Sequence, residues 1–135
     1  MRRPMVLLIA LAGLLVASAA LAAKPQTGTA NLTSLAASGI TGTAELRVEN
    51  SGLVRVHETL SGLSPGVTYT SRVFSSSATC GAGPSVMLQT FTANGAGKAS
   101  FNVVAPPQVG PSLVSASISV QQGTAVLSCG EIIFQ

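Results

Sequence analysis

Short segments in which apolar and polar residues alternate follow one another along most of this chain, separated by glycine, proline and asparagine. The clearest is 42–49, where Ala44, Leu46 and Val48 alternate with threonine, glutamate and arginine. Because successive side chains of a strand point to opposite faces of a sheet, this pattern predicts a strand buried on one face. No segment keeps the period of an amphipathic helix. The pattern therefore indicates a chain built from packed strands.

About eight strands are expected, because turn residues recur at intervals of roughly ten residues. Two prolines at 106–107 end one of these segments, since proline cannot donate a hydrogen bond to a neighbouring strand. The expected strands are 28–34, 42–49, 54–60, 68–74, 86–92, 99–104, 114–120 and 125–134, the last interrupted near Cys129 and Gly130. This arrangement predicts an all-β fold, an antiparallel β-sandwich or flattened eight-stranded barrel.

The N-terminus has the features of a secretory signal. Two arginines at positions 2 and 3 precede an apolar run over 5–16, and Ala20-Leu21-Ala22 fits an A-x-A cleavage site. We expect a signal peptide over 1–22 and a single domain over 23–135. The apolar run is too short to cross a bilayer, and no other stretch is long enough, so no membrane span is expected after cleavage. The prediction is a periplasmic or secreted protein.

Charge and cysteine content narrow the functions further. Two of the seven basic residues belong to the expected signal, and the rest nearly balance four glutamates, so no nucleic-acid partner is expected. The partner is then an unknown protein or a ligand of the cell envelope, and a homodimer remains open. The two cysteines, Cys80 and Cys129, predict a disulfide in an exported chain, with two free thiols as the alternative.

Four motifs occur in the order in which the copper/zinc superoxide dismutase family has them. They are the segments 39–43 (GITGT), 54–66 (VRVHETLSGLSPG), 92–97 (TANGAG) and 127–132 (LSCGEI). Together they make the chain resemble that family, while the pattern in 62–66 is also similar to chordin-type domains. The resemblance implies a Greek-key arrangement of the strands. It also implies that Cys80 pairs with Cys129, in agreement with the bridge expected from the cysteine count.

The metal ligands of that family do not carry over to this chain. Its copper-binding His-x-His pair matches Arg72 and Phe74, and its bridging histidine matches Ser85. The remaining copper ligand matches Ser119 or Val120, and the substrate-guiding arginine matches Val126. Because Arg72 and Phe74 alternate on one expected strand, we expect their side chains to share a face. A buried Arg72 would need a carboxylate or carbonyl partner, for which Glu58 and Glu131 are candidates. The alternative is that Arg72 extends along the surface of the sandwich.

His57 is the only histidine, whereas a copper or zinc centre needs three or four converging donors. No metal, cofactor or catalytic residue is therefore expected. A serine nucleophile would also lack an orienting acid, because the chain has no aspartate. His57 and Glu58 form a candidate polar site, although Glu58 falls on the apolar face of 54–60. For His57 itself, the expectation is an exposed strand residue paired with serine or threonine across the ladder.

These observations favour an exported, non-catalytic superoxide dismutase-like sandwich that serves as a binding or structural module of the cell envelope. Two alternatives remain. One is a copper/zinc-type dismutase or a copper-handling protein with an atypical site, and the other is an extracellular adhesion-type module.

Overall fold

The computed structural model describes residues 26–81, 83–106 and 115–135. These residues form strands, turns and loops without an α-helix, which confirms the all-β prediction. Within these ranges, no helix is long and apolar enough to cross a membrane. The expected signal peptide, residues 1–22, and the expected start of a strand at Val114 lie outside the described residues.

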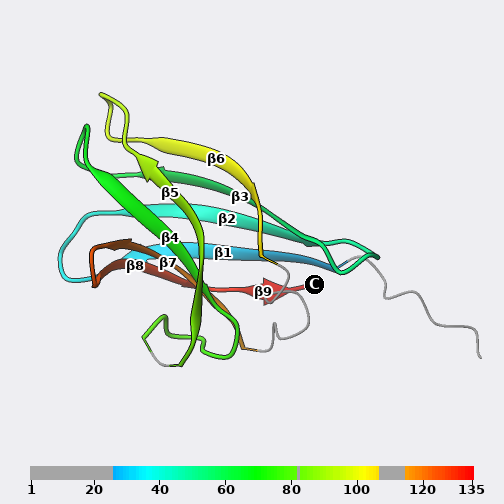
Figure 1. Ribbon diagram of the computed structural model, residues 1–135. Helices are drawn as coiled ribbons and strands as arrows, with labels where there is room; N and C mark the ends of the chain where they lie inside the picture. The colour runs from blue at the N-terminus through cyan, green and yellow to red at the C-terminus, as the bar shows by residue number, and fades with distance from the viewer. Residues whose placement is uncertain (1–25, 82, 107–114) are drawn as a thin grey trace, which may run out of the picture.

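Eight strands form one antiparallel path in the order β5-β4-β7-β8-β1-β2-β3-β6, and a short ninth strand pairs with β1 (Figure 1). The strands are β1 (Gln26–Ser34), β2 (Thr41–Val48), β3 (Val54–Ser61), β4 (Thr68–Phe74), β5 (Ser85–Thr92), β6 (Ala99–Val104), β7 (Ser117–Gln122), β8 (Ala125–Glu131) and β9 (Ile133–Phe134). The connections β3–β4 and β6–β7 pass between strands that are not neighbours, as in a Greek key. The fold is thus a nearly closed, barrel-like sheet.

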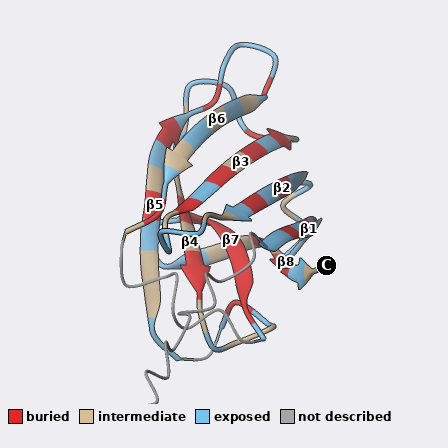
Figure 2. Cartoon of the chain, turned by 90° about the vertical axis from the view of Figure 1, so that its right-hand side faces the viewer, coloured by how far each residue is buried: buried red, intermediate tan, exposed pale blue. Residues whose placement is uncertain are grey.

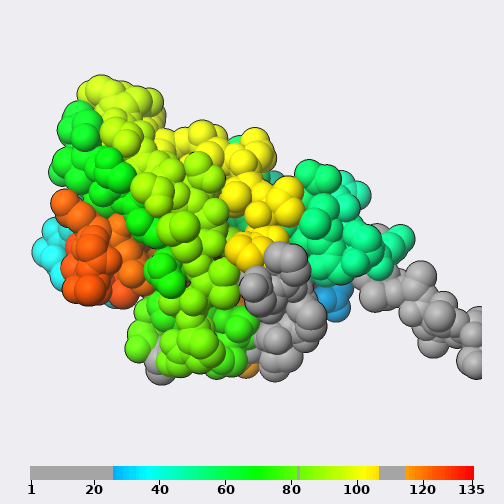
Figure 3. Space-filling view, in the orientation of Figure 1, coloured from blue at the N-terminus to red at the C-terminus, as the bar shows by residue number. Residues whose placement is uncertain are grey.

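β5 and β6 are the two ends of this path, and their surfaces lie next to each other (Figure 3). No backbone pairing joins them in the described part of the chain. The rings of Phe91 on β5 and Phe101 on β6 bridge the seam, with their centroids 4.9 Å apart. Side-chain packing therefore closes the barrel where hydrogen bonds do not.

The end of the chain differs from the sequence prediction. The last strand is interrupted at Ile132, not near Cys129 and Gly130, because the β7–β8 ladder continues through Glu131. At Ile132 the chain stops pairing with β7, and the residues of β9 that follow pair with β1. The Ile132 amide donates a hydrogen bond to the Ala116 carbonyl at 2.8 Å. Gly130 does not break the strand. Glycine is needed there because a Cβ would lie 2.6 Å from the Asn31 carbonyl oxygen.

Alternation along the strands produces one buried face, visible as alternating buried and exposed bands on β2 and β3 in Figure 2. These inner faces meet inside the barrel and form a single apolar core. Its largest fully buried apolar side chains are Ile40, Leu46, Val54, Val56, Leu60, Val73, Ile118 and Val120. Glu58 lies in the same interior, fully buried.

The β3–β4 loop and the β5–β6 turn are joined at one end of the barrel. The Leu63 amide donates to the Gly97 carbonyl at 3.0 Å. Gly97 has a φ of 70°, and a Cβ at this position would collide with the Leu63 carbonyl, so glycine is required. Nearby, the hydroxyl of the buried Tyr69 accepts a hydrogen bond from the Ser64 amide at 2.9 Å. This bond fixes the crossover between the two sides of the barrel.

Candidate functional site

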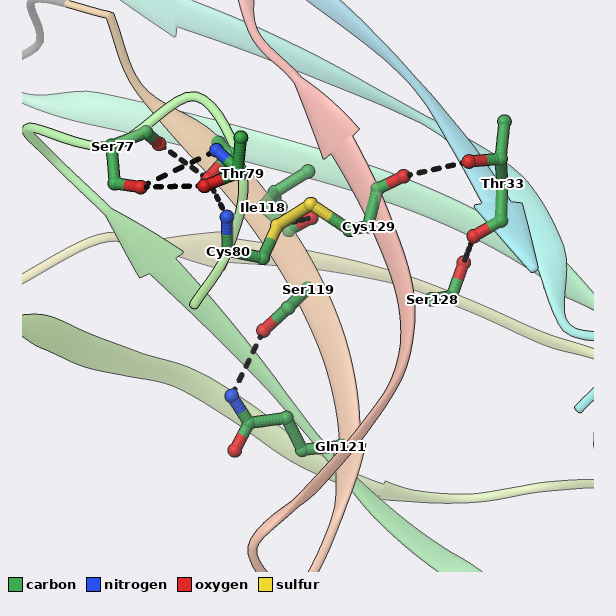
Figure 4. Close-up of a disulfide and its surroundings, with 10 residues drawn as sticks. Thr33, Ser77, Thr79, Cys80, Ile118, Ser119, Gln121, Ser128 and Cys129 are labelled. Carbon is green, nitrogen blue, oxygen red and sulfur yellow. Dashed lines mark hydrogen bonds between the residues drawn. A yellow bond between two sulfur atoms is a disulfide. The ribbon is translucent and has the colours of Figure 1, made fainter. Parts of the chain in front are cut away.

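Cys80 and Cys129 form a disulfide, as expected, with their Cα atoms 5.9 Å apart (Figure 4). It joins β8 to the loop that follows β4. Ser117 on β7 holds the same loop, because its hydroxyl donates to the Ser77 carbonyl at 2.5 Å and accepts from the Cys80 amide at 3.0 Å. The disulfide fits a compartment outside the cytoplasm.

Arg72 and Phe74 lie on the same face of β4. They pair with Ser119 and Ser117 in an uninterrupted ladder with β7, so the two-residue spacing places their side chains together. Phe74 is buried but does not belong to the core cluster. Arg72 and Phe74 therefore lie on the outer face of β4, and Phe74 is buried there without contributing to the barrel core.

Arg72 is bonded to Ser85, the third residue at which the resembled family has a ligand. Its Nε donates to the Ser85 hydroxyl at 2.9 Å, and its Nη2 donates to the Ser85 carbonyl at 3.3 Å. The partner is therefore a carbonyl and a hydroxyl, and the suggestion of Glu58 or Glu131 was wrong. Glu58 cannot reach Arg72, because its side chain points into the barrel and that of Arg72 points out.

Of the two candidates for the remaining ligand position, only Ser119 faces the Arg72 side. Ser119 lies directly across the ladder from Arg72 and accepts a hydrogen bond from the Gln121 side chain at 3.2 Å (Figure 4). Val120 belongs to the apolar core instead. The structure thus brings Arg72, Ser85 and Ser119 together on one side of the sheet. Their side chains present one guanidinium and two hydroxyl groups there.

His57 and Glu58 point to opposite faces of β3 and do not form one site. On the outer face, His57 Nδ1 is 2.9 Å from the Asn102 side-chain oxygen across the ladder with β6. Its Nε2 is 3.4 Å from the Thr59 hydroxyl on the same strand. The cross-strand partner is therefore asparagine, where the sequence suggested serine or threonine. The register of β3 against β6 determines which residue faces His57, and in this register it is Asn102.

The Glu58 carboxyl is enclosed in the core. Its Oε2 accepts a hydrogen bond from the Ser71 hydroxyl at 2.5 Å, while Oε1 has no hydrogen-bond partner among the described residues. Burial raises the pKa of Glu58 from 4.5 to about 7, and the Ser71 hydrogen bond opposes this rise. With no exposed surface, this carboxyl cannot reach a substrate in solution.

The side chains that could act as metal donors do not converge in the described part of the chain. The sequence has one histidine, four acidic residues and two cysteines, and all of them fall within the described ranges. No three of these side chains in 26–81, 83–106 and 115–135 gather into a group that could hold a metal ion. Both cysteines are in the disulfide.

A groove of about 510 Å³ crosses the outer face of β1, β2, β3 and β6, and the sequence reasoning missed it. Arg47 lies opposite Arg55 in the β2–β3 ladder, and Glu45 lies opposite His57 one row away. The lining comprises Thr27, Glu45, Leu46, Arg47, Arg55, Val56, His57, Asn102, Val103 and Val104. Its signal in the sequence was the outward-facing charge in two adjacent strands, which has meaning only once their register is known.

Comparison with known proteins adds no assignment. A scan against protein-family models finds no match, and a search of curated proteins finds none either.

Proposed function

We propose that this chain is an exported, non-catalytic binding module with a superoxide dismutase-like sandwich, acting at the cell envelope. The observation that carries the proposal is the groove on the outer face of β1, β2, β3 and β6. It is lined by arginine, glutamate, histidine and asparagine side chains on strands whose opposite faces are packed into the core. Polar groups held on a rigid scaffold favour selective binding.

The non-catalytic part is supported by the positions that correspond to copper ligands in the resembled family. Arg72 has a fixed positive charge, which opposes a divalent cation, and its guanidinium is already bonded to Ser85. His57 is on another part of the barrel surface, where its ring nitrogens lie beside Asn102 and Thr59. A redox copper ion needs several imidazole or thiolate ligands that converge on one point.

The test is to express the full-length chain in a bacterial host with copper and zinc supplied, and to purify the exported product. After dialysis, metal is measured by mass spectrometry and superoxide consumption is measured against buffer. We expect trace metal and a rate equal to that of buffer. About one copper or zinc per chain, with superoxide consumption that His57→Ala abolishes, would overturn the proposal.

A further inference from the structure

Arg47 and Arg55 place two positive charges next to each other in the groove. They are paired in register on β2 and β3, and both side chains are exposed on the outer face. Like charges placed directly opposite each other destabilise an antiparallel pair. Neither arginine contributes to the core, so packing alone does not explain their juxtaposition.

The acidic side chains of the protein neutralise only one of these two arginines. Glu49 Oε1 accepts a hydrogen bond from Arg55 Nε at 2.6 Å, which is the one salt bridge among the described residues. All four acidic side chains of the sequence lie within those residues, and none of them forms a salt bridge with Arg47. Among the described residues, the Arg47 guanidinium has no ion-pair partner, and the terminal nitrogens of Arg55 have no hydrogen-bond partner.

The surroundings indicate what kind of ligand would fit. Thr27 lies beside Arg47 in the ladder with β1, and adds a hydroxyl to the same row. Glu45 and His57 lie in the next row, where the carboxylate of Glu45 disfavours a second anion. The groove has the size of a small-molecule site. One oxyanion at the arginine end therefore matches the charge distribution better than a polyanion along the whole groove.

We propose that the groove binds small molecules that carry a carboxylate or phosphate group, which the guanidinium groups of Arg47 and Arg55 hold between them. Guanidinium groups present parallel N–H donors that match the spacing of carboxylate and phosphate oxygens. The negative charge of the ligand offsets the repulsion between the two arginines. This inference rests on the proposed binding function and specifies its ligand class.

The experiment is an NMR titration of the isotopically labelled, exported protein with inorganic phosphate and, separately, with acetate, which carries a single carboxylate. Ionic strength is held constant with sodium chloride, because exposed charges are screened by salt. We expect saturable shifts of the amides that line the groove. The probe with the lower Kd distinguishes a phosphate ligand from a carboxylate ligand.

Variants assign the binding to the arginine pair. Arg47→Gln and Arg55→Gln should each raise Kd at least tenfold, and Arg47→Lys should raise it as well, because lysine keeps the charge and loses the paired donors. Lys98→Gln is the matched control, since it removes one exposed positive charge at the other end of β6 and should leave Kd unchanged. Amide spectra of each variant establish that it remains folded.

Three results would overturn the inference: no saturable shift with either probe, an equal effect of Lys98→Gln, or full affinity in Arg47→Lys. The last of these remains informative if Arg47→Gln does not fold. Metal content and superoxide consumption are measured separately. Failure of the proposed function would therefore appear in those assays, and failure of the ligand assignment would appear only in the titration.

Discussion

Replacing Glu58 with glutamine should remove a pH dependence that the barrel core imposes on folding. Glu58 is fully buried between Ala44 and Phe101, its in-register neighbours on β2 and β6. Ser71 from β4 is the one hydrogen-bond partner of its carboxyl among the described residues. Glutamine has nearly the same shape and can still accept the Ser71 hydrogen bond, but it cannot ionise.

The sign follows from the pKa of Glu58, which burial raises from 4.5 to about 7 in the folded chain. A carboxyl with a higher pKa in the folded state binds its proton more tightly there than in the unfolded chain. The contribution of Glu58 to the free energy of unfolding is therefore fully present below pH 4.5. It decreases as the pH rises from 4.5 to about 7 and then levels off.

The magnitude comes from the same difference. Each pKa unit corresponds to about 1.4 kcal/mol, so the rise from 4.5 to about 7 amounts to about 3 kcal/mol lost by pH 8. No cation offsets this loss, since the one salt bridge in the described ranges joins Arg55 and Glu49 on the outer face. The loss is a large share of the stability of a small domain.

The assay is urea unfolding of the wild type and of Glu58→Gln at intervals between pH 4 and pH 8. Near pH 4 the two proteins should differ by about 1 kcal/mol or less, and near pH 8 the variant should be more stable by up to about 3 kcal/mol. Glu45→Gln is the control, because Glu45 carries the same charge on the exposed face of β2. Its difference from the wild type should stay within about 0.5 kcal/mol throughout.

Parallel stability curves for the wild type and Glu58→Gln across this range would refute the reasoning. They would mean that the folded chain does not hold the Glu58 proton more tightly than the unfolded chain. A pH-dependent difference of the same size in Glu45→Gln would refute it as well, because the effect would then come from the overall charge.

The remaining predictions concern the two contacts that hold loops to the barrel. Cys80→Ala combined with Cys129→Ala should lower the free energy of unfolding by about 4 kcal/mol, because the bridge spans a separation of 49 residues; an unchanged urea midpoint would contradict this. Tyr69→Phe should cost about 1 kcal/mol, because the Ser64 amide loses its acceptor while the ring still packs. A urea midpoint equal to that of the wild type would show that another group satisfies this amide.

Local pattern was enough to predict most strands. The range expected for β4, Thr68–Phe74, is the observed one, because alternation and flanking turn residues both mark its limits. The end of β8 was wrong, because glycine at 130 was taken as a break. In the structure Gly130 lets the Asn31 backbone approach, which is a long-range requirement that a local reading cannot distinguish from a turn.

The candidate site was harder to predict. Arg72 and Phe74 share a face, as expected from their spacing. The partner of Arg72 and the separation of His57 from Glu58 into different environments depend on which strands are neighbours. Sequence alternation already placed Glu58 on the inner face. It did not indicate that Ser71 would lie opposite it inside the barrel.

By itself, the sequence determined the all-β class and the single disulfide, because alternation acts between near neighbours and two cysteines allow one pairing. Only the tertiary structure decided that Arg47 lies opposite Arg55 in a groove and that the buried Glu58 accepts a hydrogen bond from Ser71. Both arrangements depend on strand register and on how the two sides of the barrel pack. A shift of one residue in register would turn each side chain to the opposite face, so these contacts exist only in the folded chain.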